Sequence, residues 1–269
     1  MQRNITLCGC GWLGNYLLPV LADDFQVLGT TRSPHRAEQI KKNGGAVYLF
    51  ELGDNPSELC QQSENATVIL NIPPGRHHQE FNTYSQQMCS LIDAFMAHHA
   101  RHLIFISTTS VYGEKERIVT ENSELIPQTG SAKSHCTIEA YAKQRAGDAA
   151  TIVRLAGLVG PDRHPVTSLS GKQLSQANRV VNLVHIHDVV IALKRVVEQG
   201  AASKTLHLCS LVHPTRKDYY TQCAMKMALP LPIFDEDQKE VKGKQIDASA
   251  SWEYLGLTPK YASPFDMII

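Results

Sequence analysis

The sequence predicts an α/β fold, a doubly wound parallel sheet followed by a small C-terminal lobe. A short apolar run at residues 5–8 leads directly into a glycine-rich turn, GCGWLG, and an apolar helical pattern follows it. Strand and helix patterns then alternate as far as residue 155, which is typical of a parallel sheet. The 269 residues have room for one complete α/β domain and a smaller lobe.

The turn after the first strand has the spacing of a dinucleotide-binding loop. Gly9 makes the tight turn, Gly11 lets the backbone approach a pyrophosphate, and Gly14 lets the helix pack closely on the strand. The phosphates then lie on N–H groups at the helix N-terminus, where the helix dipole favours negative charge. Strand and helix flank the turn as this mechanism requires. We therefore expect cofactor contacts from Gly9, Gly11, Trp12, Leu13 and Gly14.

The second predicted strand, residues 25–30, ends where the choice between NAD and NADP is made. An acidic residue here binds the ribose 2′-hydroxyl of NAD, whereas an arginine accommodates the 2′-phosphate of NADP. This chain has Thr31 and Arg32 at the strand end, and Asp23 and Asp24 precede the strand. We expect NADP as the cofactor, with NAD as the alternative and with Thr31 and Arg32 in contact with it. An ordinary solvated Arg32 is the competing interpretation.

Two further strands, at residues 46–50 and 67–70, lead to candidate cofactor residues. Asp54 follows the third strand and is expected beside the adenine, as the N-cap of a following helix, or as both. The fourth strand runs into the turn NIPPG at residues 71–75. Ligands bind at this carboxyl edge of open α/β sheets, so we expect Asn71, Ile72 and Pro73 to line the cofactor groove.

A long helix is predicted over residues 81–99 and a fifth strand over residues 102–106. The strand leads into STTSVYG, residues 107–113, which begins with four consecutive hydroxyl side chains. Such side chains can hold a carbonyl or hydroxyl group of a substrate beside the nicotinamide. Thr108, Thr109 and Tyr112 are the candidates from this segment.

Four segments together resemble a known family. GxGxxG at residues 9–14, STTSVYG at 107–113, RLAGLVGP at 154–161 and VHIHDV at 184–189 resemble the extended and atypical short-chain dehydrogenase/reductases, the NAD(P)-dependent epimerase/dehydratase-like group, and within it the YeeZ-like members. The resemblance spans nearly the whole chain. It implies an NAD(P)-binding Rossmann domain at residues 1–156 and 179–210, and a small substrate lobe at residues 157–178 and 211–269.

The family's usual chemistry uses three side chains. A serine or threonine positions the substrate, a tyrosine is the general acid/base, and a lysine four residues later lowers the tyrosine pKa and bonds the nicotinamide ribose. The resemblance assigns the first role to Thr108 and the third to Lys133, but Thr129 stands where the tyrosine is expected. A threonine hydroxyl ionises far above a phenol's pKa of about 10, which makes it a poor acid/base near neutrality.

Three alternatives follow from Thr129. Another phenol, Tyr112 or Tyr141, supplies the proton, although Tyr141 lies in a helical pattern. A water held by Thr108 and Thr129 relays the proton. Or the chain is a nicotinamide-dinucleotide-binding sensor that lost the usual acid/base. The expected function is an NAD(P)-dependent oxidoreductase or epimerase acting on a small, sugar-like or anionic substrate, with the sensor as the alternative.

The family resemblance places substrate contacts after the sixth strand, residues 151–155. Arg163 and His164 are candidates for an anionic group, because the arginine fork matches carboxylate or phosphate, and loop residues bonded to local carbonyls are the alternative. His185 is a further substrate candidate. The spacing His185-x-His187-Asp188 suggests a metal, but no third ligand is evident nearby. We expect no metal site, and we expect Asp188 to cap the helix at 189–198.

Composition excludes several partners. The formal net charge is zero and no long basic run occurs, so we expect no nucleic-acid partner. No apolar run is long enough to span a bilayer, and a strand begins by Ile5, so we expect neither a membrane segment nor a signal peptide.

The seven cysteines lack zinc-ligand spacing, which favours reduced thiols. We therefore expect a cytoplasmic protein with a small-molecule substrate, and a homodimer is compatible with the sequence.

Overall fold

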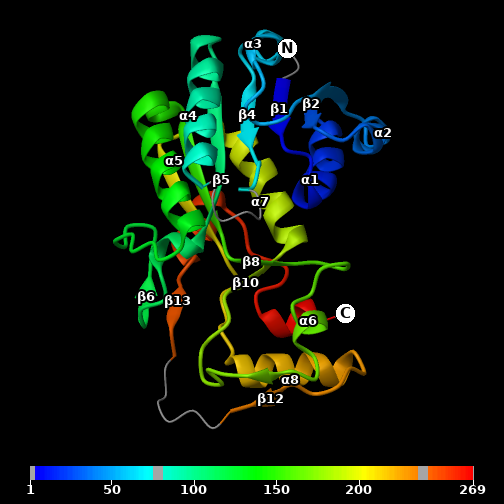
Figure 1. The fold of residues 1–269 in the computed structure, drawn as a ribbon, viewed down its shortest axis with the longest axis vertical. Coiled ribbons are helices and arrows are strands. Elements are labelled where there is room, and N and C mark those ends of the chain that lie inside the picture. The colour runs from blue at the N-terminus through cyan, green and yellow to red at the C-terminus, as the bar shows by residue number, and fades with distance from the viewer. Residues whose placement is uncertain (1–3, 75–80, 236–241, 269) are drawn as a thin grey trace. The chain divides into compact units, whose positions relative to one another are not determined.

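The computed structural model describes residues 4–74, 81–235 and 242–268 (Figure 1). The chain divides into two compact units. Unit 1 comprises Met1–Val111, Pro127–Arg154 and Val190–Leu206, and unit 2 comprises Tyr112–Ile126, Leu155–Val189 and His207–Ile269. Gly75, the last residue of the turn predicted after the fourth strand, lies outside the described residues.

A seven-stranded sheet forms the centre of the fold, in the order β11-β7-β5-β4-β1-β2-β3. β1 pairs in parallel with β2 and β4, β2 with β3, and β4 with β5. This Rossmann-like order confirms the predicted fold class, and its switch point lies between β1 and β4, where such sheets bind ligands. The bounds are β1 Asn4–Cys8, β2 Gln26–Thr31, β3 Ala46–Leu49, β4 Thr67–Leu70, β5 His102–Thr108, β7 Ala150–Leu155 and β11 Lys204–Leu208.

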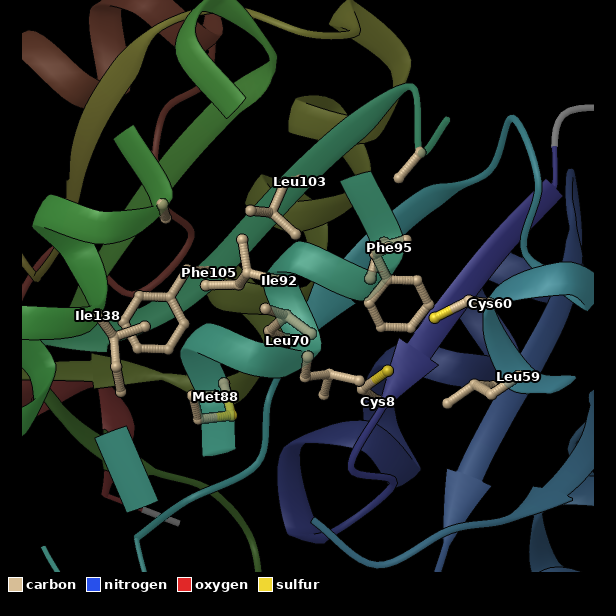
Figure 2. Packing of buried hydrophobic residues seen from close by; sticks show 14 of the residues in the cluster. Cys8, Leu59, Cys60, Leu70, Met88, Ile92, Phe95, Leu103, Phe105 and Ile138 are labelled. Atoms are coloured by element: carbon tan, nitrogen blue, oxygen red, sulfur yellow. The ribbon is translucent and has the colours of Figure 1, made fainter. Parts of the chain in front are cut away.

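Apolar side chains from β1, β4 and β5 pack against three helices on one face of the sheet (Figure 2). These helices are α3 (Ser57–Gln62), α4 (Phe81–Ala97) and α5 (Gly130–Ala146). α4 buries the apolar stripe predicted for it, including Met88, Ile92 and Phe95. It ends at Ala97, two residues before the predicted end, and His99 adopts a positive φ of 59°. α4 and α5 lie side by side (Figure 1).

The remaining helices of the sheet region are α1 (Trp12–Ala22), α2 (Pro34–Lys42) and α7 (Ile186–Gln199). α1 and α2 pack on β2, and Lys194 of α7 forms a salt bridge with Asp24, just after α1. The prediction that Asp188 caps α7 is wrong, because the helix begins two residues earlier. The Asp188 carboxylate instead accepts the backbone N–H groups of Lys260 at 2.9 Å and Tyr261 at 3.0 Å.

Unit 2 is built on short parallel strand pairs. β8 (Gly157–Val159) pairs with β10 (Leu183–His185), and β9 (Gln173–Leu174) pairs with β12 (Ile233–Phe234). β6 (Arg117–Val119) pairs with β13 (Lys244–Ile246), which explains why residues 112–126 belong to unit 2 rather than to the Rossmann domain as expected. The helices of this unit are α6 (Val166–Leu169), α8 (Arg216–Lys226) and α9 (Ser249–Leu255).

All seven cysteines are free thiols. Cys8 and Cys10 flank Gly9, and burial raises the pKa of both thiols, that of Cys10 to about 12. High thiol pKa values oppose redox chemistry, so these two residues serve packing, as their place in a tight turn suggests. None of the helices in the described part of the chain combines the length and apolarity needed to cross a bilayer.

Candidate functional site

The glycine turn between β1 and α1 requires Gly9. Its φ is +93°, and a Cβ there would lie 2.6 Å from the backbone oxygen of Asn71. The Gly9 N–H donates to the Thr30 hydroxyl at 3.0 Å, and the Gly9 carbonyl accepts from the Asn71 amide at 2.9 Å. A side chain at residue 9 would break these contacts. The turn conformation therefore requires glycine at this position and is fixed by the hydrogen bonds to Thr30 and Asn71.

Gly11 and Gly14 differ in their surroundings. A Cβ on Gly14 would lie 3.2 Å from the Gly9 carbonyl, because α1 packs closely on the turn. A Cβ on Gly11 would meet no described atom within 4 Å. α1 begins at Trp12 with no side-chain cap among the described residues. Open space at Gly11 beside an uncapped helix N-terminus fits the pyrophosphate of a dinucleotide, as the sequence predicts.

Asn71 and Ile72 follow β4 and lie against the glycine turn. The Asn71 N–H donates to the Cys8 carbonyl at 2.8 Å, and the Ile72 side chain lies 3.1 Å from the Cβ position of Gly9. The Ile72 carbonyl accepts the Tyr84 hydroxyl at 2.8 Å. Pro73 is exposed. The structure therefore places this segment beside the predicted pyrophosphate site, while contact with the cofactor stays a prediction.

At the end of β2, the predicted selector Arg32 is exposed and donates to Glu51 at 2.9 Å. Thr31 is buried, and its hydroxyl accepts the Ser33 N–H at 3.1 Å, so its side chain shapes the strand end. Glu51 lies two residues after the end of β3, and no sequence pattern pointed to it. The two charged side chains meet because their strands are neighbours and end together.

Asp54 fixes the turn after β3. Its carboxylate accepts the Glu51 N–H at 2.8 Å, and its own N–H donates to the Glu51 carbonyl at 3.0 Å. It does not cap α3, where the Asn55 side chain accepts the Ser57 N–H at 3.1 Å. Asp54 lines a cavity of about 220 Å³ with polar side chains of α4, namely Gln86, Gln87 and Ser90. The expected position of the adenine beside Asp54 remains a prediction.

The hydroxyl run after β5 divides by role. Ser107 donates to the buried carboxylate of Glu139 at 2.5 Å, so its hydroxyl is committed to the interior. Thr109 is also buried. Thr108 is partly exposed, and its oxygen accepts the Ser110 N–H at 3.2 Å. A hydroxyl that accepts from the backbone retains its own proton, so Thr108 can donate to a substrate oxygen.

Glu139 is paired with Arg154 in the interior of unit 1. Two nitrogens of the Arg154 guanidinium contact the carboxylate, at 3.0 Å and 2.5 Å, and both side chains are 3% exposed. Together with Ser107, the pair joins α5, the end of β5 and β7. The sequence analysis did not predict either residue. The signal that could have found Arg154 is its place as the one charged residue of the buried strand ATIVRL.

Thr129 is the N-cap of α5, and its hydroxyl accepts the Ala132 N–H at 3.1 Å. Lys133 lies in the first turn of the helix, with its N–H bonded to the Thr129 carbonyl at 3.0 Å. Both side chains are exposed. The helix begins at Gly130, so the residue in the expected tyrosine position is a capping threonine that also retains its hydroxyl proton.

The two alternative phenols are engaged elsewhere. The Tyr112 ring is fully buried in unit 2, and its hydroxyl lies 2.6 Å from His207 Nε2. The Tyr141 hydroxyl donates to Asp93 of α4 at 2.5 Å, which raises the pKa of Tyr141. Arg145 bonds the other Asp93 oxygen at 2.8 Å. Tyr141 lies twelve residues beyond Thr129 on the helix, about 18 Å along its axis, so it does not replace a tyrosine at that position.

The remaining predicted substrate residues lie in unit 2. Arg163 is exposed, and its backbone pairs with that of Gly160. His164 is buried, its Nε2 lies 3.0 Å from the Tyr219 hydroxyl and its Nδ1 accepts the Val166 N–H at 3.2 Å. The His185 ring lies against Tyr261, with centroids 3.8 Å apart. A substrate contact by His164 would have to replace one of its present partners.

Within the described ranges, no three histidine, cysteine, aspartate or glutamate side chains are grouped as metal ligands. In unit 1, the structure brings together the predicted residues of the glycine turn and of the segment after β4, because Asn71 and Ile72 contact Gly9. The predicted residues Tyr112, Arg163, His164 and His185 belong to unit 2.

Comparisons with known proteins agree with this geometry. A family model described as NAD(P)H-binding matches residues 9–193. Protein YeeZ of Escherichia coli strain K12 is 31% identical over 271 residues, which covers 99% of each chain. A solved structure of a functionally unknown conserved protein from Silicibacter pomeroyi has a TM-score of 0.78 at 21% identity, covering 99% of this chain and 97% of that one.

A second solved structure is similar in fold. The UDP-glucuronic acid 4-epimerase from Bacillus cereus, in complex with UDP-glucuronic acid and NAD, has a TM-score of 0.81 at 17% identity. The match covers 99% of this chain and 96% of the epimerase.

Proposed function

This chain belongs to the NAD(P)H-binding family as a full-length relative of YeeZ, and on that premise we propose that it is an NAD(P)-dependent oxidoreductase or epimerase. The observation that carries the proposal is the space at Gly11, which no described atom fills within 4 Å of a Cβ, beside the start of α1, which no side chain of the described residues caps. Thr108 and Lys133 belong to the same unit as this turn, at the end of β5 and the start of α5. One unit thus contains the residues for binding the cofactor and for orienting a substrate.

The residues have distinct roles in the proposed reaction. The bound nicotinamide supplies the acceptor or donor of a hydride. The turn at Gly9, Gly11 and Gly14 holds the pyrophosphate, and Arg32 holds the 2′-phosphate of NADP, the cofactor we propose as preferred. Lys133 donates to the nicotinamide ribose. Its positive charge also favours an anionic oxygen on the substrate.

Proton transfer in the proposed reaction needs a group other than a phenol. Thr108 donates a hydrogen bond to the substrate oxygen and keeps its own proton. A water that accepts a hydrogen bond from Thr129 takes the proton released when the substrate hydroxyl is oxidised, or supplies it in the reverse direction, and exchanges it with solvent. Both threonine oxygens accept a backbone N–H, so each hydroxyl proton is left for such a contact. The contacts of Tyr112 and Tyr141 with His207 and Asp93 support the water relay over another phenol.

For the substrate we propose a small, sugar-like molecule with an oxidisable hydroxyl group. The fold shared with a UDP-glucuronic acid 4-epimerase supports a sugar. The exposed Arg163 in unit 2 is suited to an anionic group. A zero net charge and seven free thiols support a cytoplasmic protein whose partner is a small molecule rather than nucleic acid.

One observation favours a second candidate function. Thr129 replaces the family's phenol with a helix cap, which is a structural role. A chain that keeps the cofactor turn and has lost the acid/base would act as a sensor of the nicotinamide dinucleotide. Both functions require dinucleotide binding, and only the enzyme requires turnover.

Lys133→Ala distinguishes the two functions. In the wild-type protein we expect hydride transfer with at least one member of a library of sugar-like carbonyl and hydroxyl compounds, followed by NADPH absorbance at 340 nm. In Lys133→Ala we expect the rate to fall by about 10²-fold or more, because the positive charge that favours an anionic substrate oxygen and the donor to the nicotinamide ribose are both lost.

Tyr141→Phe is the matched control on the same helix. It removes the bond to Asp93 and should leave the rate within about twofold of wild type, since surface contacts of this kind contribute little. Tight NADPH binding with neither net oxidation of the dinucleotide nor epimerisation of any compound would favour the sensor. A Lys133→Ala rate equal to wild type would contradict the proposed role of Lys133.

A further inference from the structure

The ribose end of the candidate site carries a cation and an anion together. Arg32 follows β2 and Glu51 follows β3, and their side chains meet at 2.9 Å. The salt bridge lies just beyond the last backbone hydrogen bond between the two strand ends, which the Phe50 N–H donates to the Thr31 carbonyl at 3.0 Å. The arginine is thus directed toward the neighbouring strand end by a carboxylate.

The backbone of Glu51 is held firmly although its side chain is exposed. Asp54 bonds both its N–H and its carbonyl, at 2.8 Å and 3.0 Å. Gly53, within the same turn, has a φ of +107° and lies against Gln87. The backbone of Glu51 is therefore held beside Arg32 by Asp54, and its position does not depend on the salt bridge.

Stability does not explain the pair. The side chains of Arg32 and Glu51 are 76% and 60% exposed, and ion pairs this exposed contribute little to folding. Their position at the carboxyl edge of the sheet is where the 2′ group of the ribose is expected. A carboxylate there can accept the 2′-hydroxyl of NAD, and it repels the 2′-phosphate of NADP.

We propose that Glu51 is the residue that limits the preference of this chain for NADP, by occupying Arg32 and by repelling a 2′-phosphate. This inference rests on the proposed function, because it assumes that a nicotinamide dinucleotide binds at this edge. The carboxylate that selects NAD comes from β3 rather than from β2, and it faces the arginine that selects NADP. Wild-type protein is then expected to bind both dinucleotides.

The test is Glu51→Gln, with NAD⁺ and NADP⁺ titrated separately by calorimetry at low ionic strength. The repulsion between two like unit charges about 4 Å apart in water raises a dissociation constant by about fivefold, and a 2′-phosphate carries up to two negative charges. We therefore expect Glu51→Gln to raise the preference for NADP⁺ over NAD⁺ by about tenfold, chiefly through tighter NADP⁺ binding. Arg32→Gln should shift the preference toward NAD⁺.

Glu38→Gln is the matched control. Glu38 forms an exposed salt bridge with Lys41 at 3.0 Å on α2, and its charge should not affect the preference. An unchanged preference in Glu51→Gln, with both dinucleotides bound, overturns this inference alone. An equal shift in Glu38→Gln also overturns it, because the effect would then belong to net charge. If neither dinucleotide binds the wild-type protein, the proposed function fails as well.

Discussion

Gly11→Val abolishes dinucleotide binding and leaves the fold intact. A valine at this position enters the space proposed for the pyrophosphate, where no described protein atom lies within 4 Å of a Cβ. The φ of Gly11 is −82°, outside the positive range that favours glycine, and its ψ of −148° lies just beyond the β region, so we expect valine to be accommodated at a small cost in stability. We expect the dissociation constants for NAD⁺ and NADP⁺ to rise at least about 100-fold, the equivalent of about 2.7 kcal/mol. Calorimetric titration measures this change, and a thermal melt checks the fold.

Gly9→Val provides the contrasting variant. Its Cβ would lie 2.6 Å from the Asn71 oxygen, at a φ of +93° that a valine rarely adopts. This variant should lose stability itself, whereas Gly11→Val should melt within a few degrees of wild type. Normal dinucleotide binding by Gly11→Val would show that the pyrophosphate lies elsewhere.

Arg154→Met should destabilise unit 1 strongly. It removes the guanidinium from the buried Glu139 carboxylate, which keeps the hydrogen bond from the Ser107 hydroxyl, and breaking a buried ion pair in this way costs about 3–5 kcal/mol. Urea unfolding followed by circular dichroism gives the change in free energy. Thr108, the residue after Ser107, should also lose its fixed position.

The double variant Glu139→Leu with Arg154→Met tests whether the loss of stability in Arg154→Met comes from the buried, unpaired Glu139 carboxylate. Replacing both members of a buried pair by apolar residues is often close to neutral, so it should recover much of the stability. A loss below about 1 kcal/mol in Arg154→Met would mean that the pair is not buried as described, since surface pairs are worth about this much.

The cofactor turn was predictable because its determinants are local. An apolar run, three glycines and an apolar helical stripe within the first 22 residues specify β1, the turn and α1. The observed strand Asn4–Cys8 begins one residue before the predicted one. Steric rules at Gly9 and Gly14 act between neighbours in sequence or between adjacent strands. Sequence reasoning therefore predicted the turn correctly, and its contact with a pyrophosphate stays a prediction.

The ion pairs were not predictable because their partners are distant in sequence. Glu139 bonds Ser107 across 32 residues and Arg154 across 15, and Glu51 meets Arg32 across 19. The order of the strands brings Arg32 and Glu51 together, and the packing of α5 on β5 and β7 brings Glu139 to Ser107 and Arg154. The hydroxyl run accordingly looked uniform in sequence, although Ser107 faces the interior and Thr108 does not.

The start of α5 lay within reach of sequence reasoning and was missed. Threonine is a favoured N-cap, so Thr129 before an alanine-containing helical run signals a helix beginning at residue 130. The family pattern directed attention to the missing phenol at this position. Local rules therefore predict that Thr129 caps α5, but they do not predict which group replaces the tyrosine in proton transfer.

Isothermal titration calorimetry of the wild-type protein with NADP⁺, and separately with NAD⁺, tests directly whether the turn at Gly9 to Gly14 holds a dinucleotide. The predicted result is saturable heat with one site per chain, accompanied by a rise in melting temperature. Absence of both heat and thermal shift with either dinucleotide would contradict it, and enzyme and sensor would fall together.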